Sequence, residues 1–287
     1  MIPPLRTLAW RVPLLLVGVL GTGMFLGLEK YVIFVPERAI EMTPQSEGLP
    51  YEEIWFPATD GVRLHGWLVP APDARFTMVW FHGNAGNISH RVDNIKYLHR
   101  YLSLPQLPNI FIFNYRGYGR SGGPLSDLSE EATYHDGEGA LAYLRGRVDL
   151  AHTKLVYFGR SLGAAIAVEM ARRHAPVGLI LETPFTSIQD MARVALPFLP
   201  VGNLLRTKYD SLHKMPQIRV PLLVLHGDRD DVVPYELGRQ LFEAANPPKT
   251  FYTIRRARHN DTYIVGDSAY FDAWARFLRG LEVASPL

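Results

Sequence analysis

The sequence predicts an α/β fold, in which a mostly parallel sheet carries helices on both faces. Three observations support this prediction. Short apolar segments alternate with helical patterns along residues 76–281, as they do where helices join parallel strands. Most of these segments are continuously apolar, which is typical of strands covered on both faces. Two further strands joined by a tight turn precede them and are expected to form an antiparallel pair.

The chain enters this pattern through two strands at residues 51–58 and 62–70. They are joined at Asp60-Gly61, a dipeptide that favours tight hairpin turns. Six further strands follow, bounded by turn residues and separated by helical segments. The six strands are expected at residues 76–81, 109–115, 154–158, 178–182, 221–227 and 249–254. The helices are expected up to about residue 101, and at residues 129–147, 164–173, 235–245 and 270–281.

Composition and charge exclude several functional classes. The chain has 287 residues, of which 47% are hydrophobic, and a net charge of +2. The length allows one large core, and the charge offers nothing to attract nucleic acid. The sequence contains no cysteine, so disulfides, thiolate metal sites and a cysteine nucleophile are excluded.

The N-terminus differs from the rest of the chain. Residues 12–28, VPLLLVGVLGTGMFLGL, carry no charge and have about the minimum length that spans a bilayer. Trp10 and Tyr31 flank them, as interfacial anchors do. A buried core helix and a cleaved signal peptide are the alternatives. We predict a tail at residues 1–11, a transmembrane anchor at 12–28, a linker at 29–50 and a catalytic domain at 51–287.

The flanking cations determine the orientation of this anchor only weakly. Arg6 and Arg11 precede the apolar stretch, whereas Lys30 and Arg38 follow it. The terminal amine adds one positive charge to the side of residues 1–11, so the charge count favours a cytoplasmic N-terminus. The expectation is a single-pass membrane protein whose catalytic domain lies on the non-cytoplasmic side.

Two stretches match Gly-x-Ser-x-Gly, a pattern that can present a nucleophilic serine: GRSGG around Ser121 and GRSLG around Ser161. Ser161 follows a buried strand and precedes a helical segment, so it lies in a sharp strand-turn-helix. Ser121 is followed by Gly122, Gly123 and Pro124, which predict an open loop. We therefore predict that Ser161 is the nucleophile and Ser121 a loop residue.

A nucleophilic serine needs a base, and the base needs an orienting acid, in the chain order serine, acid, histidine. His259 follows the last strand, in a loop expected at the carboxyl edge of the sheet. Asp228, Asp230 and Asp231 follow the strand at 221–227. We predict that Asp230 is the acid that orients His259, with Asp231 as the next candidate, because residues 232–234 can bury Asp230. The three acids lack the glycine and distal glutamate of a calcium loop.

The same chemistry needs two backbone N–H donors for the negative oxygen that forms during the reaction. Leu162, directly after Ser161, is expected to supply one. The second should come from HGNAGN, the glycine-rich loop after the strand at 76–81. Asn84 is the candidate, with Ala85 as its near neighbour.

Six motifs together resemble the α/β-hydrolase superfamily. They are FHGNAGN, NYRGYGRSGG, GRSLGAAIA, ETPFTS, PLLVLHGDRDDVVP and RARHND. In particular, they resemble the membrane-anchored, single-span group of this superfamily that includes protein depalmitoylases and lysophospholipases and is related in sequence to serine aminopeptidase-like hydrolases. This resemblance covers nearly all of residues 31–281. It implies an α/β-hydrolase fold with Ser161, Asp230 and His259 as nucleophile, acid and base.

An insertion at about residues 185–219 is too long for a simple connection and predicts a small helical cap. Its apolar side chains could line an acyl pocket or pack the cap itself; they are Met191, Val194, Leu196, Phe198, Leu199, Leu204 and Leu205. We expect a membrane-anchored serine hydrolase of acyl esters or thioesters that needs no metal or cofactor. Its substrate could be a lipid or a lipidated protein, and nucleic acid is not expected as a partner. The alternatives are a serine peptidase and a catalytically idle scaffold.

Overall fold

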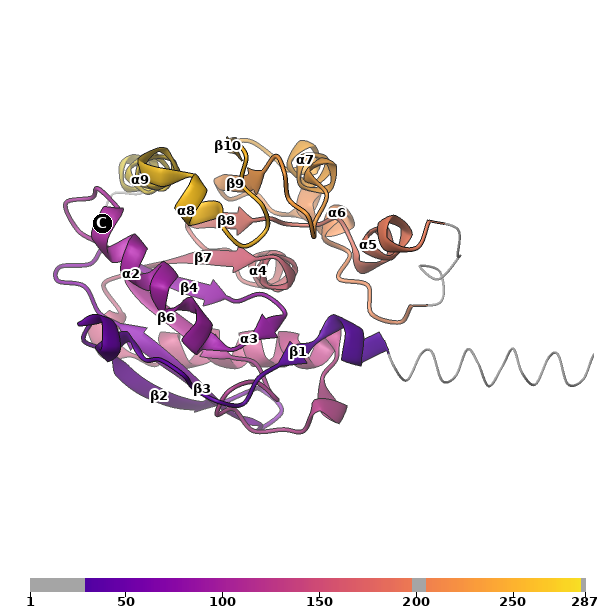
Figure 1. The fold of residues 1–287 in the computed structure, drawn as a ribbon. Helices are drawn as coiled ribbons and strands as arrows, with labels where there is room; N and C mark the ends of the chain where they lie inside the picture. Colours follow the sequence, from indigo (N-terminus) through magenta and orange to yellow (C-terminus); the bar gives the residue numbers. More distant parts are fainter. Residues whose placement is uncertain (1–28, 198–204, 285–287) are drawn as a thin grey trace, which may run out of the picture.

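The structure is a computed structural model that describes residues 29–197 and 205–284. An eight-stranded sheet, in the order β10-β9-β8-β7-β4-β6-β3-β2, forms its centre (Figure 1). Strand β3 runs antiparallel to both its neighbours, and every other neighbouring pair is parallel. The strands are β2 (Glu52–Pro57), β3 (Arg63–Val69), β4 (Phe76–Phe81), β6 (Asn109–Asn114), β7 (Lys154–Arg160), β8 (Gly178–Glu182), β9 (Leu222–Gly227) and β10 (Lys249–Ile254).

Among the helices of the described residues, five lie where the sequence predicts them with small differences at their ends, α5 and α6 lie in the predicted cap, and α8 was not predicted. They are α2 (Val92–Tyr101), α3 (Glu130–Arg145), α4 (Leu162–Arg173), α5 (Ile188–Ala195), α6 (Ser211–Lys214), α7 (Tyr235–Ala244), α8 (Thr262–Val265) and α9 (Asp267–Ala284). Strand β7 runs two residues further than expected, and α4 begins two residues earlier. A single residue, Ser161, therefore separates them.

Each face of the sheet has its own apolar core. One core packs α3, α4 and α7 against side chains such as Phe111 and Phe113. The other packs α2 and α9 against Ile110 and Ile112 of the same strand. Successive residues of a strand point to opposite faces, so the continuous apolar sequence of β6 supplies both cores. The prediction of a mostly parallel sheet with helices on both faces is confirmed.

The stretch that we assigned to a linker, residues 29–50, is part of the domain. Residues 29–33 are helical, Phe34 is buried in the core, and β1 (Val35–Pro36) pairs with β5 (Ala85–Gly86). Asn87 donates from its side chain to the backbone oxygens of Glu37 and Ala39. The linker assignment is wrong because the prolines and polar residues of this stretch suggested a loose connection, whereas hydrogen bonds to segments distant in sequence fix its backbone to the domain.

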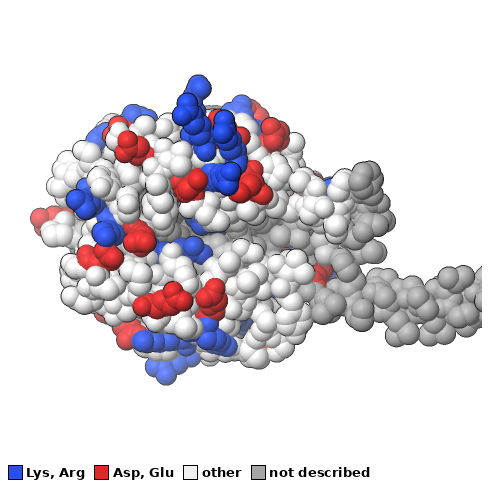
Figure 2. Space-filling model, in the orientation of Figure 1, with Lys and Arg blue, Asp and Glu red and all other residues white. Residues whose placement is uncertain are grey.

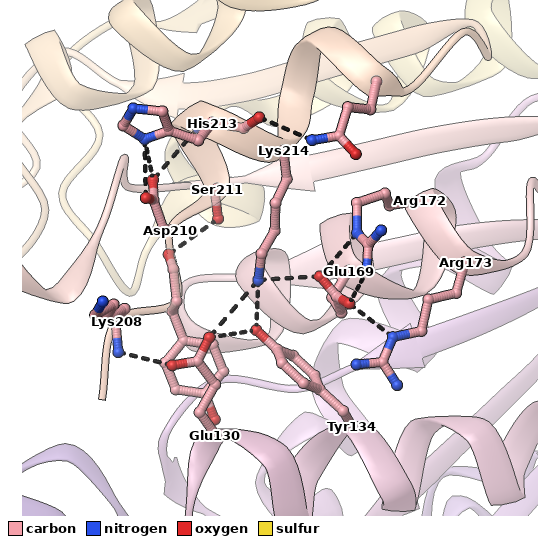
Figure 3. Close-up of polar contacts among 12 residues, drawn as sticks. Glu130, Tyr134, Glu169, Arg172, Arg173, Lys208, Asp210, Ser211, His213 and Lys214 are labelled. Carbon is pink, nitrogen blue, oxygen red and sulfur yellow. Dashed lines mark hydrogen bonds and ion pairs between the residues drawn. The ribbon is translucent and has the colours of Figure 1, made fainter. Parts of the chain in front are cut away.

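Helix α6, which lies between β8 and β9, and the residues before it are tied to the rest of the domain by the polar contacts of Figure 3. Glu130 of α3 accepts a hydrogen bond from the Lys208 backbone at 2.7 Å. Lys214 of α6 donates to the Tyr134 hydroxyl at 2.8 Å and pairs with Glu169 at 3.0 Å. Burial raises the pKa of Glu169, but Lys214 and two neighbouring arginines lower it to about 2. Because Glu169 lies on α4, these contacts hold α6 against the helix that follows Ser161.

The predicted transmembrane anchor, residues 12–28, lies outside the described residues. Among the helices of residues 29–197 and 205–284, none has the length and hydropathy needed to cross a bilayer.

Candidate active site

Ser161 occupies a strained turn between β7 and α4. Its backbone has φ 54° and ψ −119°, a conformation that residues with a side chain rarely adopt. Such strain is retained where the surrounding structure imposes it, and it occurs often at functional sites. The backbone N–H of Ser161 donates to the Glu182 carbonyl at 2.9 Å, which holds the turn against β8. The predicted strand-turn-helix around Ser161 is therefore present.

The two glycines that flank this turn allow close backbone contact. A Cβ added to Gly163 would lie 2.0 Å from the carbonyl oxygen of Phe81 at the end of β4. A Cβ on Gly159 would lie 2.6 Å from the Cα of Ala164. Both distances are far below van der Waals contact, so no other residue fits at either position without moving the backbone.

Asp230 and His259 are in direct contact, although 29 residues separate them in sequence. His259 Nδ1 lies 2.8 Å from Asp230 Oδ2 and 3.1 Å from Oδ1. The backbone N–H groups of Val232 and Val233 also donate to Asp230 Oδ1, at 2.9 and 2.8 Å. With one ring nitrogen bound to a carboxylate, the His259 ring has a defined orientation.

A second histidine, His226, lies on the same carboxylate. Its Nε2 is 3.3 Å from Asp230 Oδ2 and 3.1 Å from the Val233 carbonyl oxygen. Burial raises the pKa of Asp230, but the hydrogen bonds from His226 and His259 outweigh burial and hold this pKa well below its usual range. We had interpreted His226 as a structural residue of β9. The sequence carries no signal for this contact, because residues four apart meet on a helix, whereas His226 lies in β9 and Asp230 in the loop that follows.

The loop that carries His259 is fixed by a buried ion pair. Arg160, the neighbour of Ser161, donates to Glu182 at 3.0 Å and to the backbone oxygen of His259. Glu182 also accepts hydrogen bonds from Thr262 and Tyr270, at 2.7 and 2.6 Å. These contacts link the turn at Ser161 to the His259 loop. Sequence analysis did not identify Arg160 or Glu182, because a buried arginine–glutamate pair has no local signature.

Ser161 is not joined to His259 or Asp230 by a hydrogen bond. Within the described residues the Ser161 hydroxyl has no hydrogen-bond partner, and Ser161 lines a pocket. In structures without substrate, hydrogen bonds between reacting groups are often long and tighten only when the substrate binds. The geometry therefore pairs Asp230 with His259 and leaves the Ser161 hydroxyl open to a ligand.

The loop after β4 lies beside Ser161, as the prediction of a second donor requires. A Cβ added to Gly83 would lie 3.6 Å from the Ser161 Cβ. Asn84 and Leu162 both line the pocket that contains Ser161. The Asn84 carbonyl accepts from Val35 N–H and the Tyr118 hydroxyl. The backbone N–H groups of Asn84 and Leu162 have no partner among the described residues.

The pocket itself is apolar, with a volume of about 380 Å³. Besides Ser161 and Leu162, its lining comes from residues 29–33, helix α5 with Leu196, the loop after β9, and the single residues Asn84, Phe185 and Leu205. The apolar lining residues are Val32, Ile33, Leu162, Phe185, Ile188, Met191, Ala192, Ala195, Leu196, Leu205, Val232 and Val233. Of the seven side chains that we considered for an acyl pocket, Met191, Leu196 and Leu205 line it and Val194 does not. Phe198, Leu199 and Leu204 lie outside the described residues.

Ser121 has a different environment. Its hydroxyl donates to the Asn114 carbonyl at 2.7 Å and accepts from His65 N–H at 2.9 Å, and both contacts are buried. The residue lies in a loop after β6, as predicted. The Ser121 hydroxyl has both of its hydrogen bonds satisfied in the interior, so it stabilises the fold and is not accessible to a substrate.

Neither of the other two acids after β9 orients the His259 ring. Asp228 accepts from the backbone N–H of Arg256 at 2.6 Å. Asp231 approaches the backbone N–H of His259 at 3.4 Å. Of the two acids that we weighed most closely, only Asp230 contacts the imidazole.

One group of acids and histidine lies close enough to be considered as a metal site: Glu37, Glu41 and His90. His90 Nδ1 accepts a hydrogen bond from Asn87 N–H at 3.1 Å, so Nδ1 carries no proton and Nε2 does. Nε2 faces the carboxylates of Glu37 and Glu41, at 3.6 and 3.8 Å. In this neutral tautomer Nε2 presents an N–H to the carboxylates, whereas metal ligation requires a free lone pair on Nε2.

The sequence matches the family described as Hydrolase_4, serine aminopeptidase S33, over residues 72–210 and 201–262. The α/β hydrolase domain-containing protein WAV2 of Arabidopsis thaliana is 33% identical over 93% of this chain and 92% of its own length. Protein bem46 of Schizosaccharomyces pombe is 31% identical over 85% of this chain and 82% of its own length.

Solved structures show the same fold. The esterase Pf2001 of Pyrococcus furiosus has a TM-score of 0.72 at 20% identity, over 86% of this chain and 98% of that one. Est1E of Butyrivibrio proteoclasticus, in a complex with ferulic acid, has a TM-score of 0.65 at 20% identity, over 80% of this chain and 99% of that one. At this level of identity the similarity concerns the fold alone.

Proposed function

The chain belongs to the serine aminopeptidase S33 family of the α/β-hydrolase superfamily, and from this premise we propose a membrane-anchored serine hydrolase that cleaves acyl esters or thioesters. The observation that carries the proposal is the position of Ser161. This serine occupies a strained turn and lines an apolar pocket. Asp230 and His259 form a contact of 2.8 Å in the loops that follow β9 and β10.

In the proposed reaction, Ser161 Oγ attacks the acyl carbon while His259 Nε2 takes its proton. Asp230 holds the ring through Nδ1 and stabilises the imidazolium that forms. The negative oxygen accepts hydrogen bonds from the backbone N–H groups of Leu162 and Asn84. His259 then protonates the departing alcohol or thiol, which leaves an acyl group on Ser161. Water, deprotonated by His259, releases the acid and restores the serine.

The nature of the pocket supports an acyl substrate. Its lining includes one charged residue, Glu29, whose carboxylate already accepts hydrogen bonds from the backbones of Arg206 and Thr207, at 3.1 and 3.3 Å. The remaining lining is almost entirely apolar, and burying an alkyl chain there is favourable by about 0.8 kcal/mol per methylene. A lipid or a lipidated protein would present such a chain near a membrane.

A serine peptidase is the second candidate, because the matching family is described as a serine aminopeptidase. An aminopeptidase must bind a positively charged amine close to the nucleophile. Glu29 is the one acid among the described pocket residues, and its hydrogen bonds to residues 206 and 207 occupy it. This occupancy favours the ester or thioester reaction.

Location is part of the proposal. Residues 12–28 would cross the membrane once, with the catalytic domain on the non-cytoplasmic side. The proposed chemistry uses side chains and backbone of this chain and requires no cofactor.

A substrate panel tests the proposal. Full-length protein in mild detergent would be assayed on p-nitrophenyl esters of graded chain length, acyl thioesters and amino-acid p-nitroanilides, with labelling by a fluorophosphonate probe. We expect labelling and ester or thioester turnover, both lost in Ser161→Ala, and little amide turnover. Preferred amide turnover would favour the peptidase. Absence of both labelling and turnover would favour an idle scaffold.

A further inference from the structure

The mouth of the pocket is lined by exposed apolar side chains from three distant parts of the chain. Val32 belongs to the N-terminal helical residues 29–33, Leu196 follows α5, and Val232 follows β9. All three line the pocket, yet their exposed fractions are 76%, 43% and 51%. A side chain that lines a cavity and is also exposed lies at its opening. We call these three residues the apolar rim.

More apolar surface adjoins the rim. Tyr31 precedes Val32, Val35 lies three residues after it, and Val194 is the neighbour of the pocket residue Ala195; all three are exposed. In Figure 2, charged side chains gather over the left and centre of the face, and the surface next to the residues drawn in grey carries few. Exposed apolar side chains gathered at one pocket mouth commonly mark an interaction site.

The position of the rim in the chain indicates what covers it. Val32 follows the uncharged stretch at residues 12–28 by four positions. A segment of that composition is stable in a lipid bilayer. The helix that contains Val32 is also fixed to the domain: Glu29 accepts hydrogen bonds from Arg206 and Thr207, and Asn84 donates to the Ile33 carbonyl at 3.1 Å. The rim therefore cannot lie far from a bilayer that holds residues 12–28.

From this arrangement we propose that the apolar rim docks on the surface of a lipid bilayer, so that the pocket opens directly into the lipid. Val32, Leu196 and Val232 enter the boundary between headgroups and acyl chains. Contacts of this kind bury apolar groups about 5–10 Å into the interface. The docking itself does not depend on the proposed hydrolysis. The consequence that an acyl chain enters the pocket from the membrane rests on the proposed function.

The absence of cysteine from the sequence makes a direct test possible. Full-length Val32→Cys, Leu196→Cys and Val232→Cys would each carry one thiol, labelled with the environment-sensitive fluorophore NBD. The matched control is Val148→Cys, which is 89% exposed and precedes β7, at the opposite edge of the sheet from Ser161. Each labelled protein would be incorporated into phosphatidylcholine vesicles, with and without spin-labelled lipid as a quencher.

We expect the quencher lipid to reduce NBD emission at the three rim positions by about twofold or more, as contact with the interface requires. Emission at position 148 should be unchanged and should remain sensitive to iodide in the aqueous phase. A rim that is covered by protein, or that faces water, would show no lipid quenching at positions 32, 196 and 232, and the proposal would be overturned. Equal quenching at position 148 would also overturn it, because contact would then not be confined to the rim.

This readout separates the docking surface from the proposed chemistry. Fluorescence needs no turnover, so lipid quenching in a protein without hydrolase activity would keep the docking surface and reject the proposed function. Turnover of soluble esters without lipid quenching would keep the proposed function and reject the docking surface. Cooperative thermal unfolding of each labelled variant establishes that it is folded.

Discussion

Two serines share the same five-residue pattern, and their hydrogen bonds give them opposite environments. Ser121 Oγ is enclosed between Asn114 and His65. Ser161 Oγ has no partner among the described residues and faces the pocket. The pattern alone does not specify a nucleophile. What matters is whether the backbone around the serine presents its hydroxyl or buries it.

The two serines should therefore respond differently to alanine. Ser161→Ala should reduce ester turnover by several orders of magnitude, because the acyl-enzyme cannot form. Ser121→Ala should keep most of the turnover per folded molecule and lower stability by about 1–3 kcal/mol, since it leaves buried partners unsatisfied. Steady-state kinetics and urea unfolding measure the two effects. An active Ser161→Ala beside an inactive Ser121→Ala would reverse the assignment.

The three acids after β9 differ in their contact with His259. Asp230→Asn should lower turnover about 10⁴-fold, because the amide no longer holds the imidazole in the required orientation and charge state. Labelling by a fluorophosphonate should become slow but remain detectable. Asp228→Asn and Asp231→Asn should be mild, since neither side chain contacts the ring. If Asp231→Asn were the inactive variant, Asp231 rather than Asp230 would be the acid that orients His259.

The lowered pKa of Asp230 also predicts a dependence of stability on pH. The folded state favours the ionised carboxyl, so its contribution is complete above the ordinary pKa, 3.8. It is lost progressively as the pH falls below that value towards the lower pKa of the folded state. Thermal unfolding of the protein and of Asp230→Asn between pH 7 and pH 3 measures this. The stability difference between the two should be constant above about pH 5 and narrow below pH 4. If the stability difference between the two proteins widened as the pH falls, the pKa of Asp230 would not be lowered in the folded state.

At the scale of elements, helix α5 forms one wall of the pocket. Its residues Met191, Ala192 and Ala195 line the pocket, whereas Val194 is exposed and does not. The spacing follows the period of the helix, which places positions 191, 192 and 195 on one face. The pocket side and the outer side of the helix can therefore be substituted separately.

This arrangement predicts a change in chain-length preference. Ala192→Trp should fill part of the pocket and reduce kcat/KM for long-chain esters by about tenfold or more relative to short ones. Turnover of p-nitrophenyl acetate should change little. Val194→Trp is the matched control on the outer side and should leave the ratio unchanged. A parallel loss for all chain lengths in Ala192→Trp would mean that the acyl chain does not bind in this pocket.

At the scale of the whole molecule, the N-terminal residues contribute to the pocket as well as to the proposed anchor. Val32 and Ile33 line the pocket, and Glu29 accepts hydrogen bonds from Arg206 and Thr207 of the predicted cap. A chain that begins near Val35 lacks all three side chains. A chain that begins at Glu29 keeps them, so the place at which the anchor is removed matters.

Full-length protein should remain with membranes after washing at high salt and at alkaline pH. Insertion of residues 12–28 is favourable by several kcal/mol, at about 0.3–0.6 kcal/mol for each strongly apolar residue. A chain starting at Glu29 should be released as a folded, active domain. A chain starting at Val35 should unfold at a lower temperature and lose long-chain turnover. Full-length protein in the soluble fraction with its N-terminus intact would contradict the anchor.

Much of the architecture could be predicted because its signals are local. The apolar segments of β4, β8 and β10 mark strands at the residues where the structure has them. The glycines at positions 159 and 163 predict a tight turn between a strand and a helix. Hydrophobic periodicity and the steric freedom of glycine act over a few residues, so they can be interpreted without knowing the rest of the molecule.

Other features were decided only by tertiary structure. Asp230 and Asp231 occupy the same loop, and the paired strands β9 and β10 determine which carboxylate reaches His259. The packing of residues 29–50 and the buried pair of Arg160 with Glu182 depend on contacts between segments far apart in sequence. Hydrogen-bond partners across the fold follow from strand register and from the space left between elements. A local pattern of residues contains neither.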